Sequence, residues 1–323
     1  MTSFTTSILP RAFAATCLIA CSFVQTSSAQ DNETSGPSFK TWPAAVLYSL
    51  AEPYANTPGA NDWSCQPSAQ RPRPVVLVHG TLANRYNNWH YIAPRLADAG
   101  YCVYALNYGQ DPEATLNYPG VMGLADMRDG AKELSDFVDQ ILAATNATQV
   151  DMVGHSQGGL MPRHYLKFEG GANPENPSLN KVHSLITFGA PHHGSTASGL
   201  GYFLRAFEDL TGFFAENSPA QEQQLHGSEF VETLNADGET VPGVHYVSIS
   251  SLYDYVITPR ETTFLTAGLG ATVENVTLQE GCYLDFSTHV TMSTSPRVTG
   301  LILEALDDEG NYQAPCVFHS GNL

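Results

Sequence analysis

Basic residues are scarce in this sequence. Only 14 Lys and Arg residues stand against 32 Asp and Glu residues, which gives a formal net charge of −18 at pH 7. Proteins that bind nucleic acid place clusters of Lys and Arg against the phosphates, and no basic run is present here. The composition therefore argues against a nucleic-acid partner.

Apolar stretches long enough to cross a membrane are also lacking. The stretch at 12–24 is too short, because a spanning helix needs about 20 residues. It follows Arg11 and is followed by the small residues Ser27-Ser28-Ala29, an order that is typical of a secretory signal peptide. The sequence therefore predicts a signal peptide at 1–29, a secreted chain and no transmembrane segment in the mature protein.

A second interpretation of the same segment competes with simple secretion. Leu18-Ile19-Ala20-Cys21 has the form of a bacterial lipobox. Lipidation of Cys21 would make the protein a lipoprotein anchored in the cell envelope. We favour free secretion, because a cleavage site follows at Ala29.

Closely spaced cysteine pairs are absent as well. Removal of 1–29 leaves Cys65, Cys102, Cys282 and Cys316, and none of them forms the CxxC pair typical of zinc sites. An even number of cysteines in an exported chain predicts two disulfides. Three connectivities are possible.

The remaining sequence has the pattern of a single α/β domain over 71–323, preceded by an irregular segment at 30–70. Short runs rich in β-branched and apolar residues predict five buried strands, at 74–78, 101–106, 150–153, 184–188 and 245–249. An apolar stripe between 124 and 141, at spacings of three and four, predicts an amphipathic helix. Alternating strands and helices indicate a mostly parallel sheet with helices on both faces.

More than fifty residues separate the fourth and fifth predicted strands, and we expect a cap or lid insertion at about 195–243. Within it, 201–214 is rich in aromatic residues. One interpretation is a crossover helix whose apolar residues Phe203, Phe207, Leu210 and Phe214 face the core. The other is a cap whose aromatic face lines an acyl pocket or contacts lipid.

Gly154-His155-Ser156-Gln157-Gly158 matches the pattern G-x-S-x-G. The motif follows a predicted strand and precedes a plausible helix at 160–166, which is the context that a nucleophile elbow requires. The serine of an elbow lies in a strained turn where side chains two residues away would collide with the sheet or the helix. This pattern indicates that Ser156 is a catalytic nucleophile.

Serine needs a base, and the base needs an orienting carboxylate. In proteins with this elbow, the chain order is Ser, Asp or Glu, then His. Asp254 follows the fifth predicted strand, at the end of the sheet where active-site loops gather. Asp285 is the competitor, but it leaves too little chain before the base.

Two histidines follow Asp254. His289 comes after 281–284, which could form the last strand, whereas His319 lies in an irregular tail. His289 is therefore the expected base. His192 and His193 precede the acid, and we interpret them as loop residues near the cleft.

An oxyanion hole needs two donors. One is the backbone N–H of Gln157, directly after the nucleophile. The second should come from the loop after the first strand, where Gly80 permits a sharp turn. Thr81 is our choice, because its hydroxyl could add a hydrogen bond, and Leu82 is the fallback.

With these residues in place, the sequence resembles the secreted class 2 lipases of actinobacterial type and, more distantly, the yeast lipase B type. The segments that carry the resemblance are 77–81, 154–160, 252–254 with Pro259, and Cys282 with His289. The resemblance implies the α/β-hydrolase fold, a Ser156-Asp254-His289 triad, and oxyanion roles for Thr81 and Gln157. It also implies that Cys65 pairs with Cys102 and Cys282 with Cys316. The cap has no clear match, and His79 departs from the lipase B type.

The sequence therefore predicts a secreted hydrolase that cleaves acylglycerols or similar lipid esters through an acyl-enzyme. No metal or organic cofactor is implied. One alternative is an acyltransferase that moves the acyl group to a lipid or sugar alcohol. Another is a non-catalytic module of the same fold that binds lipid.

Overall fold

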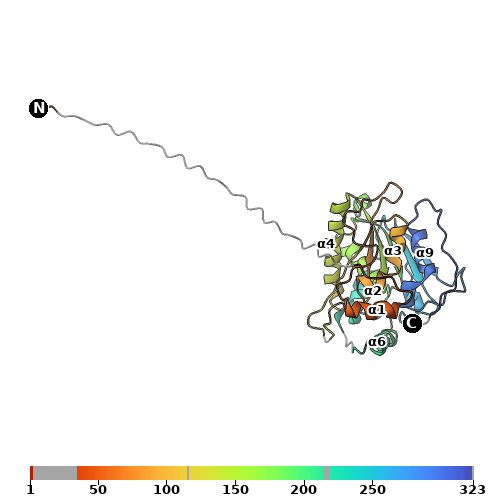
Figure 1. Ribbon diagram of the computed structural model, residues 1–323. Coiled ribbons are helices and arrows are strands. Elements are labelled where there is room, and N and C mark those ends of the chain that lie inside the picture. Colours follow the sequence, from red (N-terminus) through yellow and green to blue (C-terminus); the bar gives the residue numbers. More distant parts are fainter. Residues whose placement is uncertain (3–34, 115, 214–217, 322–323) are drawn as a thin grey trace. The chain divides into compact units, whose positions relative to one another are not determined.

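The computed structural model describes residues 1–2, 35–114, 116–213 and 218–321 (Figure 1). The chain divides into two units, Met1–Asn32 and Glu33–Leu323, and all described helices and strands belong to the second. Cys21 and all but the first two residues of the predicted signal peptide lie outside the described residues. Within these ranges no helix has both the length and the apolar character needed to cross a bilayer.

One parallel sheet organises the second unit. Its strands are β1 (Val75–Val78), β2 (Val103–Ala105), β3 (Val150–His155), β4 (Val182–Phe188), β5 (His245–Ser250) and β6 (Thr272–Thr277). They lie in the order β2-β1-β3-β4-β5-β6, and each neighbouring pair is parallel. The first five strands overlap the five predicted ones. They are buried on both faces, which explains why apolar and β-branched residues predominate in them.

Helices cover both faces of the sheet. The α-helices are α1 (Trp42–Ala51), α2 (Arg85–Trp89), α3 (Ile92–Asp98), α4 (Met127–Thr145), α5 (Gln157–Phe168), α6 (Ala197–Thr211), α7 (Pro219–Gln223), α8 (Glu229–Asn235) and α9 (Pro296–Ala305). Three 3₁₀ turns are η1 (Pro177–Leu179), η2 (Arg260–Thr263) and η3 (Thr291–Thr294). Figure 1 shows α4 on one side of the sheet and α3 and α9 on the other.

Alternation of side chains along the strands builds two separate cores. Val76 of β1 belongs to a core with α4, α5 and α8, whereas its neighbour Val75 belongs to a core with α3 and α9. The predicted apolar stripe becomes the buried face of α4. That helix begins after Asp126, whose carboxylate accepts the Arg128 N–H, and ends at Asn146 in a left-handed conformation.

Two expectations about secondary structure are wrong. The segment predicted as irregular at 30–70 contains α1, which has Pro43 in its first turn and buries one face around Trp42 and Val46. The suggested last strand at 281–284 is a turn, and the last strand is β6 instead. Because β6 is an edge strand and largely exposed, it lacks the apolar run that identifies the central strands.

The interval predicted as a cap has two parts. Helices α7 and α8 contribute Ala220, Phe230 and Leu234 to the core that α4 and α5 share. Helix α6 belongs to a third cluster, in which Phe203 and Phe207 pack with α1 and the loops above the sheet. Phe203 and Phe207 therefore face inward and Leu210 is partly buried, an arrangement that fits both interpretations, because Phe203 also lines the space beside Ser156. Phe214 lies outside the described residues. The fold is that of the α/β-hydrolases.

Candidate active site

Ser156 occupies the sharp turn between β3 and α5. Its φ of 56° and ψ of −124° lie outside the regions that a non-glycine residue ordinarily adopts. The surrounding glycines make this turn possible. A Cβ at Gly154 would collide with the carbonyl of Gly158, and a Cβ at Gly158 would collide with the carbonyl of Val78 in β1. The motif therefore contains glycine where the strand and helix come closest.

Ser156, His289 and Asp254 form a continuous chain of contacts. His289 Nε2 lies 3.0 Å from Ser156 Oγ, and His289 Nδ1 lies 2.9 Å from Asp254 Oδ2. The side chains of His289 and Asp254 are each only 2% exposed. This arrangement can move a proton from the serine to the imidazole while the carboxylate stabilises the resulting imidazolium.

Backbone donors hold the Asp254 carboxylate in place. Asp254 follows β5, and its Oδ1 accepts hydrogen bonds from the N–H groups of Val256 at 2.8 Å and Ile257 at 2.9 Å. Oδ2 is thereby directed toward His289. The loop fixes both the position and the rotation of the carboxylate.

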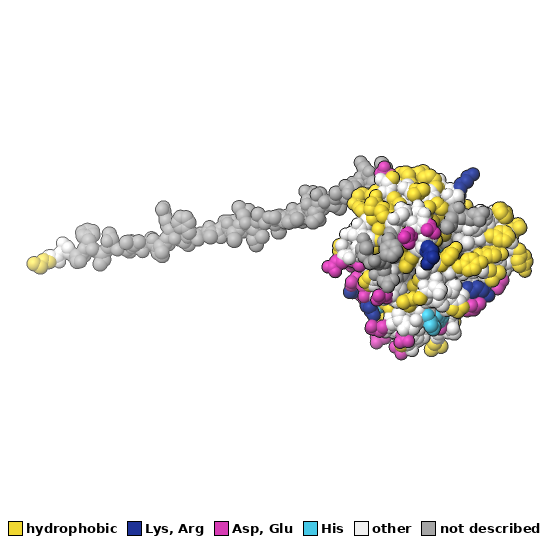
Figure 2. All heavy atoms as spheres, turned by 90° about the horizontal axis from the view of Figure 1, so that it is seen from below, with side chains coloured by type: hydrophobic (Ala, Val, Ile, Leu, Met, Phe, Trp, Pro, Cys, Tyr) yellow, Lys and Arg dark blue, Asp and Glu magenta, His cyan; other side chains and the backbone are white. Residues whose placement is uncertain are grey.

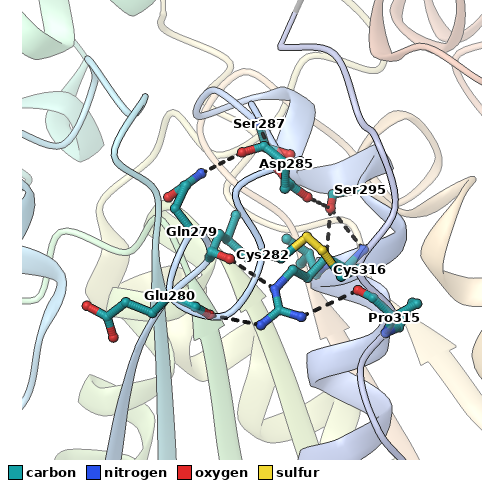
Figure 3. The surroundings of a disulfide bond; sticks show 11 residues. Gln279, Glu280, Cys282, Asp285, Ser287, Ser295, Pro315 and Cys316 are labelled. Atoms are coloured by element: carbon teal, nitrogen blue, oxygen red, sulfur yellow. Dashed lines mark hydrogen bonds between the residues drawn. A yellow bond between two sulfur atoms is a disulfide. The ribbon is translucent and has the colours of Figure 1, made fainter.

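The competing acid, Asp285, serves another purpose. Its side chain accepts hydrogen bonds from the Ser287 N–H at 2.8 Å and from the Ser295 hydroxyl at 2.6 Å (Figure 3). These contacts hold the loop that precedes His289 against the start of α9. His319 lies in the same region, with Nε2 3.2 Å from the carbonyl of Thr291.

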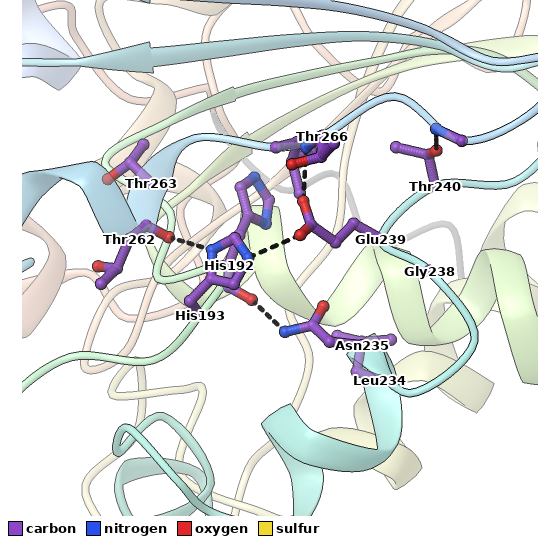
Figure 4. Close-up of polar contacts among 12 residues, drawn as sticks. His192, His193, Leu234, Asn235, Gly238, Glu239, Thr240, Thr262, Thr263 and Thr266 are labelled. Atoms are coloured by element: carbon purple, nitrogen blue, oxygen red, sulfur yellow. Dashed lines mark hydrogen bonds and ion pairs between the residues drawn. The ribbon is translucent and has the colours of Figure 1, made fainter.

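His192 and His193 lie in a polar cluster on the loop after β4. His193 bridges the carbonyl of Thr262 and the carboxylate of Glu239, which lies 3.0 Å from Nε2 (Figure 4). The carbonyl of His192 accepts the Asn235 amide N–H at 3.0 Å. The cluster ties this loop to the end of α8. The side chain of His192 turns to the sheet instead, where its Nε2 lies 3.1 Å from Thr187 Oγ1 of β4.

The two predicted oxyanion residues lie in contact with each other. Thr81 Oγ1 donates to Gln157 Oε1 at 2.6 Å and accepts from Gln224 Nε2 at 2.9 Å. A hydroxyl has one proton, so the expected extra hydrogen bond from Thr81 Oγ1 to an oxyanion is wrong in this arrangement. The backbone N–H groups of Thr81 and Gln157 remain candidates, the latter because the first N–H groups of a helix have no intrahelical acceptor.

His79 supports the turn that carries Thr81. Its Nδ1 lies 2.9 Å from the carbonyl oxygen of Gly80, and its ring stacks on Tyr108 with centroids 4.4 Å apart. Burial lowers the pKa of His79 to about 4. The ring is therefore neutral at pH 7 and can donate Nδ1–H to the carbonyl. Leu82, the fallback donor, adopts a φ of 61° and buries its side chain beside α1 and α6.

The cavity beside Ser156 is small. Its volume is about 10 Å³, enough for one water molecule at most. Phe203 of α6 closes one side, with its ring centroid 5.8 Å from that of His289, and Trp42 of α1 also lines the cavity. Among the described residues, no group of three or more His, Cys, Asp or Glu side chains could hold a metal ion.

The four described cysteines form two disulfides, with the pairing that the resemblance implies. Cys65 joins Cys102 with a Cα–Cα distance of 5.7 Å, and Cys282 joins Cys316 with a distance of 5.3 Å. The second bridge ties the segment before His289 to the tail (Figure 3). Arg297 lies beside it and donates to the carbonyls of Leu278, Glu280 and Pro315.

Three polar residues near Ser156 were not predicted from the sequence. Gln224 Nε2 donates to Thr81 Oγ1, while Asn88 and His155 lie in contact with each other and line the cavity beside the serine. His155 occupies a variable position of the motif, and Asn88 and Gln224 belong to no motif. Asn88 is 67 residues from its partner His155, and Gln224 is 143 residues from its partner Thr81, so no local sequence pattern identified either contact.

Comparison with known proteins agrees with this architecture. The strand, elbow and helix, with an acid and a histidine on later loops, define an α/β-hydrolase. Aspergillus fumigatus lipase B has this fold and superposes with a TM-score of 0.60 at 21% identity, over 80% of this chain and 57% of that one. Residues 72–299 match the model of the class 2 lipase family. The chain belongs to the class 2 lipase family.

Two bacterial triacylglycerol lipases are similar in sequence. Those of Pseudarthrobacter phenanthrenivorans and Burkholderia plantarii are each 35% identical over 204 residues, or 61% of this chain. The matched region covers 56% and 49% of the two proteins, so the chain spans about half the length of these relatives.

Proposed function

We propose that this protein is an exported serine hydrolase that cleaves carboxylic esters of lipids, acylglycerols among them, through an acyl-enzyme. The observation that carries the proposal is the chain of contacts from Ser156 Oγ through His289 to Asp254, at 3.0 and 2.9 Å. Membership of the class 2 lipase family supports it, as do two relatives named triacylglycerol lipases.

The geometry supports a two-step reaction. Ser156 Oγ attacks the ester carbonyl while His289 Nε2 takes the hydroxyl proton, and the N–H groups of Thr81 and Gln157 bind the oxyanion. The bond to the alkoxy group then breaks, and His289 returns the proton to the leaving alcohol. Water repeats the sequence and releases the acid. Asp254 orients the imidazole throughout.

A lipid substrate is supported by the surface around the site. The loops at 252–255 and 281–288 and the tail at 315–321 contain only two charged residues, Asp254 and Asp285, and both are buried. Exposed apolar side chains on these segments are Leu252, Tyr255, Tyr283, Leu284, Phe286, Val317 and Phe318. Figure 2 views the side where α6 lies in Figure 1, and hydrophobic side chains cover much of it. In a chain of net charge −18, an uncharged apolar surface suits a neutral lipid interface.

Helix α6 is the proposed cap. The cavity of about 10 Å³ that described residues form beside Ser156 cannot hold an acyl chain, so we propose that Phe203 or a neighbour moves to admit the substrate. Export is supported by the two disulfides, which persist in oxidising compartments. Mass spectrometry of the mature N-terminus distinguishes cleavage after Ala29 from lipidation at Cys21.

Labelling with a fluorophosphonate probe tests the nucleophile. We expect the wild-type protein to be labelled, Ser156→Ala to lose labelling, and the exposed control Ser178→Ala to keep it. Labelled Ser156→Ala would overturn the assignment. Unlabelled wild-type protein that still binds lipid would instead favour the non-catalytic module.

Turnover and binding test the substrate. We expect hydrolysis of p-nitrophenyl esters of several chain lengths and of emulsified triacylglycerol. Adsorption of Ser156→Ala to the emulsion should fall with Phe318→Ser and not with Leu179→Ser, an equally exposed apolar residue that precedes β4 at the other end of the sheet. Equal adsorption by both variants would contradict the proposed surface.

A further inference from the structure

Two buried polar side chains, which also line the small cavity beside Ser156, connect the three loops of the candidate site. Asn88 belongs to α2, and His155 is the last residue of β3; their exposed fractions are 1% and 5%. Asn88 Oδ1 accepts the Gly80 N–H at 3.0 Å and lies 3.0 Å from His155 Nδ1. His155 Nε2 lies 3.0 Å from the carbonyl oxygen of His289.

We propose that Asn88 and His155 are positioning residues that hold the oxyanion loop and the loop of the base in register with the nucleophile. The inference rests on the proposed function. The described hydrogen bond of Ser156 Oγ is made with His289 and not with either of these side chains, so neither is proposed as a catalytic group.

The positions in the chain explain why these contacts matter. Gly80 directly precedes Thr81, and His155 directly precedes Ser156. The contact on the third loop is made to the backbone of His289 itself. Each contact therefore involves either a residue of the candidate site or the residue directly before one in the chain. A serine hydrolase loses rate when such groups shift by about 1 Å, because the donors must meet the oxyanion at hydrogen-bond distance.

Packing leaves the Gly80 turn little freedom on the side of the elbow. A Cβ at Gly80 would lie 3.1 Å from the Ser156 Cβ and 3.2 Å from the carbonyl oxygen of His155. The ring of His155 stacks on Phe188 of β4 with centroids 4.6 Å apart. This stacking fixes the plane of the ring, with Nδ1 beside Asn88 Oδ1 and Nε2 beside the His289 carbonyl oxygen. Burial lowers the pKa of His155, so the neutral ring donates its single N–H to one of these two acceptors and only packs against the other.

The oxygen of Asn88 is the atom that carries this role. Asn88 Nδ2 is buried and has no hydrogen-bond partner among the described residues. Replacement by Asp keeps an acceptor at the Oδ1 position, but it exchanges the unpartnered NH₂ group for a second oxygen and places a carboxyl group in a buried position. Replacement by Leu removes the acceptor and leaves the Gly80 N–H unsatisfied.

The test compares four variants in the full chain. Asn88→Leu and His155→Phe remove the contacts, and the phenyl ring preserves the stacking on Phe188. Asn88→Asp preserves the acceptor. Asn87→Ala is the structural control: Asn87 is equally buried, but its side chain bonds Ser49 and the Asn84 N–H at the start of α2.

Rates are measured with a short-chain p-nitrophenyl ester and divided by the concentration of active sites, titrated with the fluorophosphonate. We expect Asn88→Leu and His155→Phe to lower kcat about 10²-fold, the loss typical of a misplaced oxyanion donor. KM should stay within about threefold. The kcat of Asn88→Asp should stay within about fivefold of the wild-type value, a much smaller change than the loss expected for Asn88→Leu. Asn87→Ala should lower stability but leave kcat per active site unchanged.

A boronic acid separates positioning from general damage to the fold. It forms a tetrahedral adduct with an active serine, so its affinity should fall in parallel with kcat/KM in Asn88→Leu and His155→Phe. Either of two results would overturn the inference: normal kcat per active site in both variants, or a lowered kcat with unchanged boronic acid affinity. Failure of the proposed function is distinguishable, because the wild-type protein itself would then lack turnover and labelling.

Discussion

Asp254→Asn changes one atom of the candidate site, and the structure dictates how the new side chain must sit. The Asp254 Oδ1 atom accepts two backbone N–H groups, from Val256 and Ile257. Asparagine has a single oxygen, which must take this place. The opposite rotamer would direct its NH₂ group at two buried donors, at a cost of about 1–3 kcal/mol for each unsatisfied group.

In the preferred rotamer the NH₂ group faces His289 Nδ1, which lies 2.9 Å from Asp254 Oδ2 in the parent protein. Nδ1 must then accept a hydrogen bond, so the proton of the neutral ring moves to Nε2. Nε2 faces Ser156 Oγ at 3.0 Å and can no longer accept its proton. The wrong tautomer lowers the rate of a Ser-His-Asp hydrolase about 10⁴-fold, or about 5.4 kcal/mol of transition-state stabilisation.

Two measurements on Asp254→Asn check this reasoning: kcat/KM on a short-chain p-nitrophenyl ester, and the rate constant of fluorophosphonate labelling. Both should fall by about four orders of magnitude, while the urea midpoint changes little because Val256 and Ile257 keep their acceptor. Asp285→Asn is the matched control, since Asp285 is equally buried but bonds Ser287 and Ser295. Less than a tenfold loss in Asp254→Asn would refute the assigned role of Asp254.

Three further predictions concern stability. Burial, reinforced by the charge of Arg95, lowers the pKa of His90 to about 4. The unfolded chain, with a His pKa near 6.5, therefore binds an extra proton as the pH falls from about 6.5 to 4. His90→Phe should reduce the loss of unfolding free energy over this window by about 3 kcal/mol, measured by urea unfolding at several pH values. Cys282→Ser with Cys316→Ser should lower unfolding free energy by about 2–4 kcal/mol at pH 7. Gly158→Ala should abolish turnover and lower the thermal midpoint, because its Cβ meets the Val78 carbonyl.

Each of these predictions has a clear contrary result. If the unfolding free energy of His90→Phe depended on pH in the same way as that of the parent protein, the pKa of His90 would not be lowered in the folded state. Equal stability of the double cysteine variant and the parent, in the absence of reductant, would contradict the stabilising role of the bridge. Wild-type turnover by Gly158→Ala would mean that the elbow is less closely packed than its carbonyl contacts require.

Local physics made the central strands and the elbow predictable. The strands β1, β3 and β4 lie within the sheet and are covered on both faces, so apolar and β-branched residues predominate in their sequences. Glycine is required at 154 by a collision within the strand-turn-helix unit and at 158 by a collision with the neighbouring strand β1, and the motif contains both glycines. Other elements gave weaker signals. The edge strand β6 is exposed, and α1 is short, so neither has a distinctive pattern.

The sequence by itself determined the family resemblance, the central sheet and the candidates Ser156, Asp254 and His289, because these depend on periodicity, glycine positions and chain order. Only the tertiary structure decided what the candidates touch. It placed Asp285 away from His289, engaged the Thr81 hydroxyl with Gln157, and brought Asn88 to His155 across 67 residues. Hydrogen bonds of this kind depend on distances and directions between loops that are far apart in the chain, and one-dimensional spacing carries no information about them.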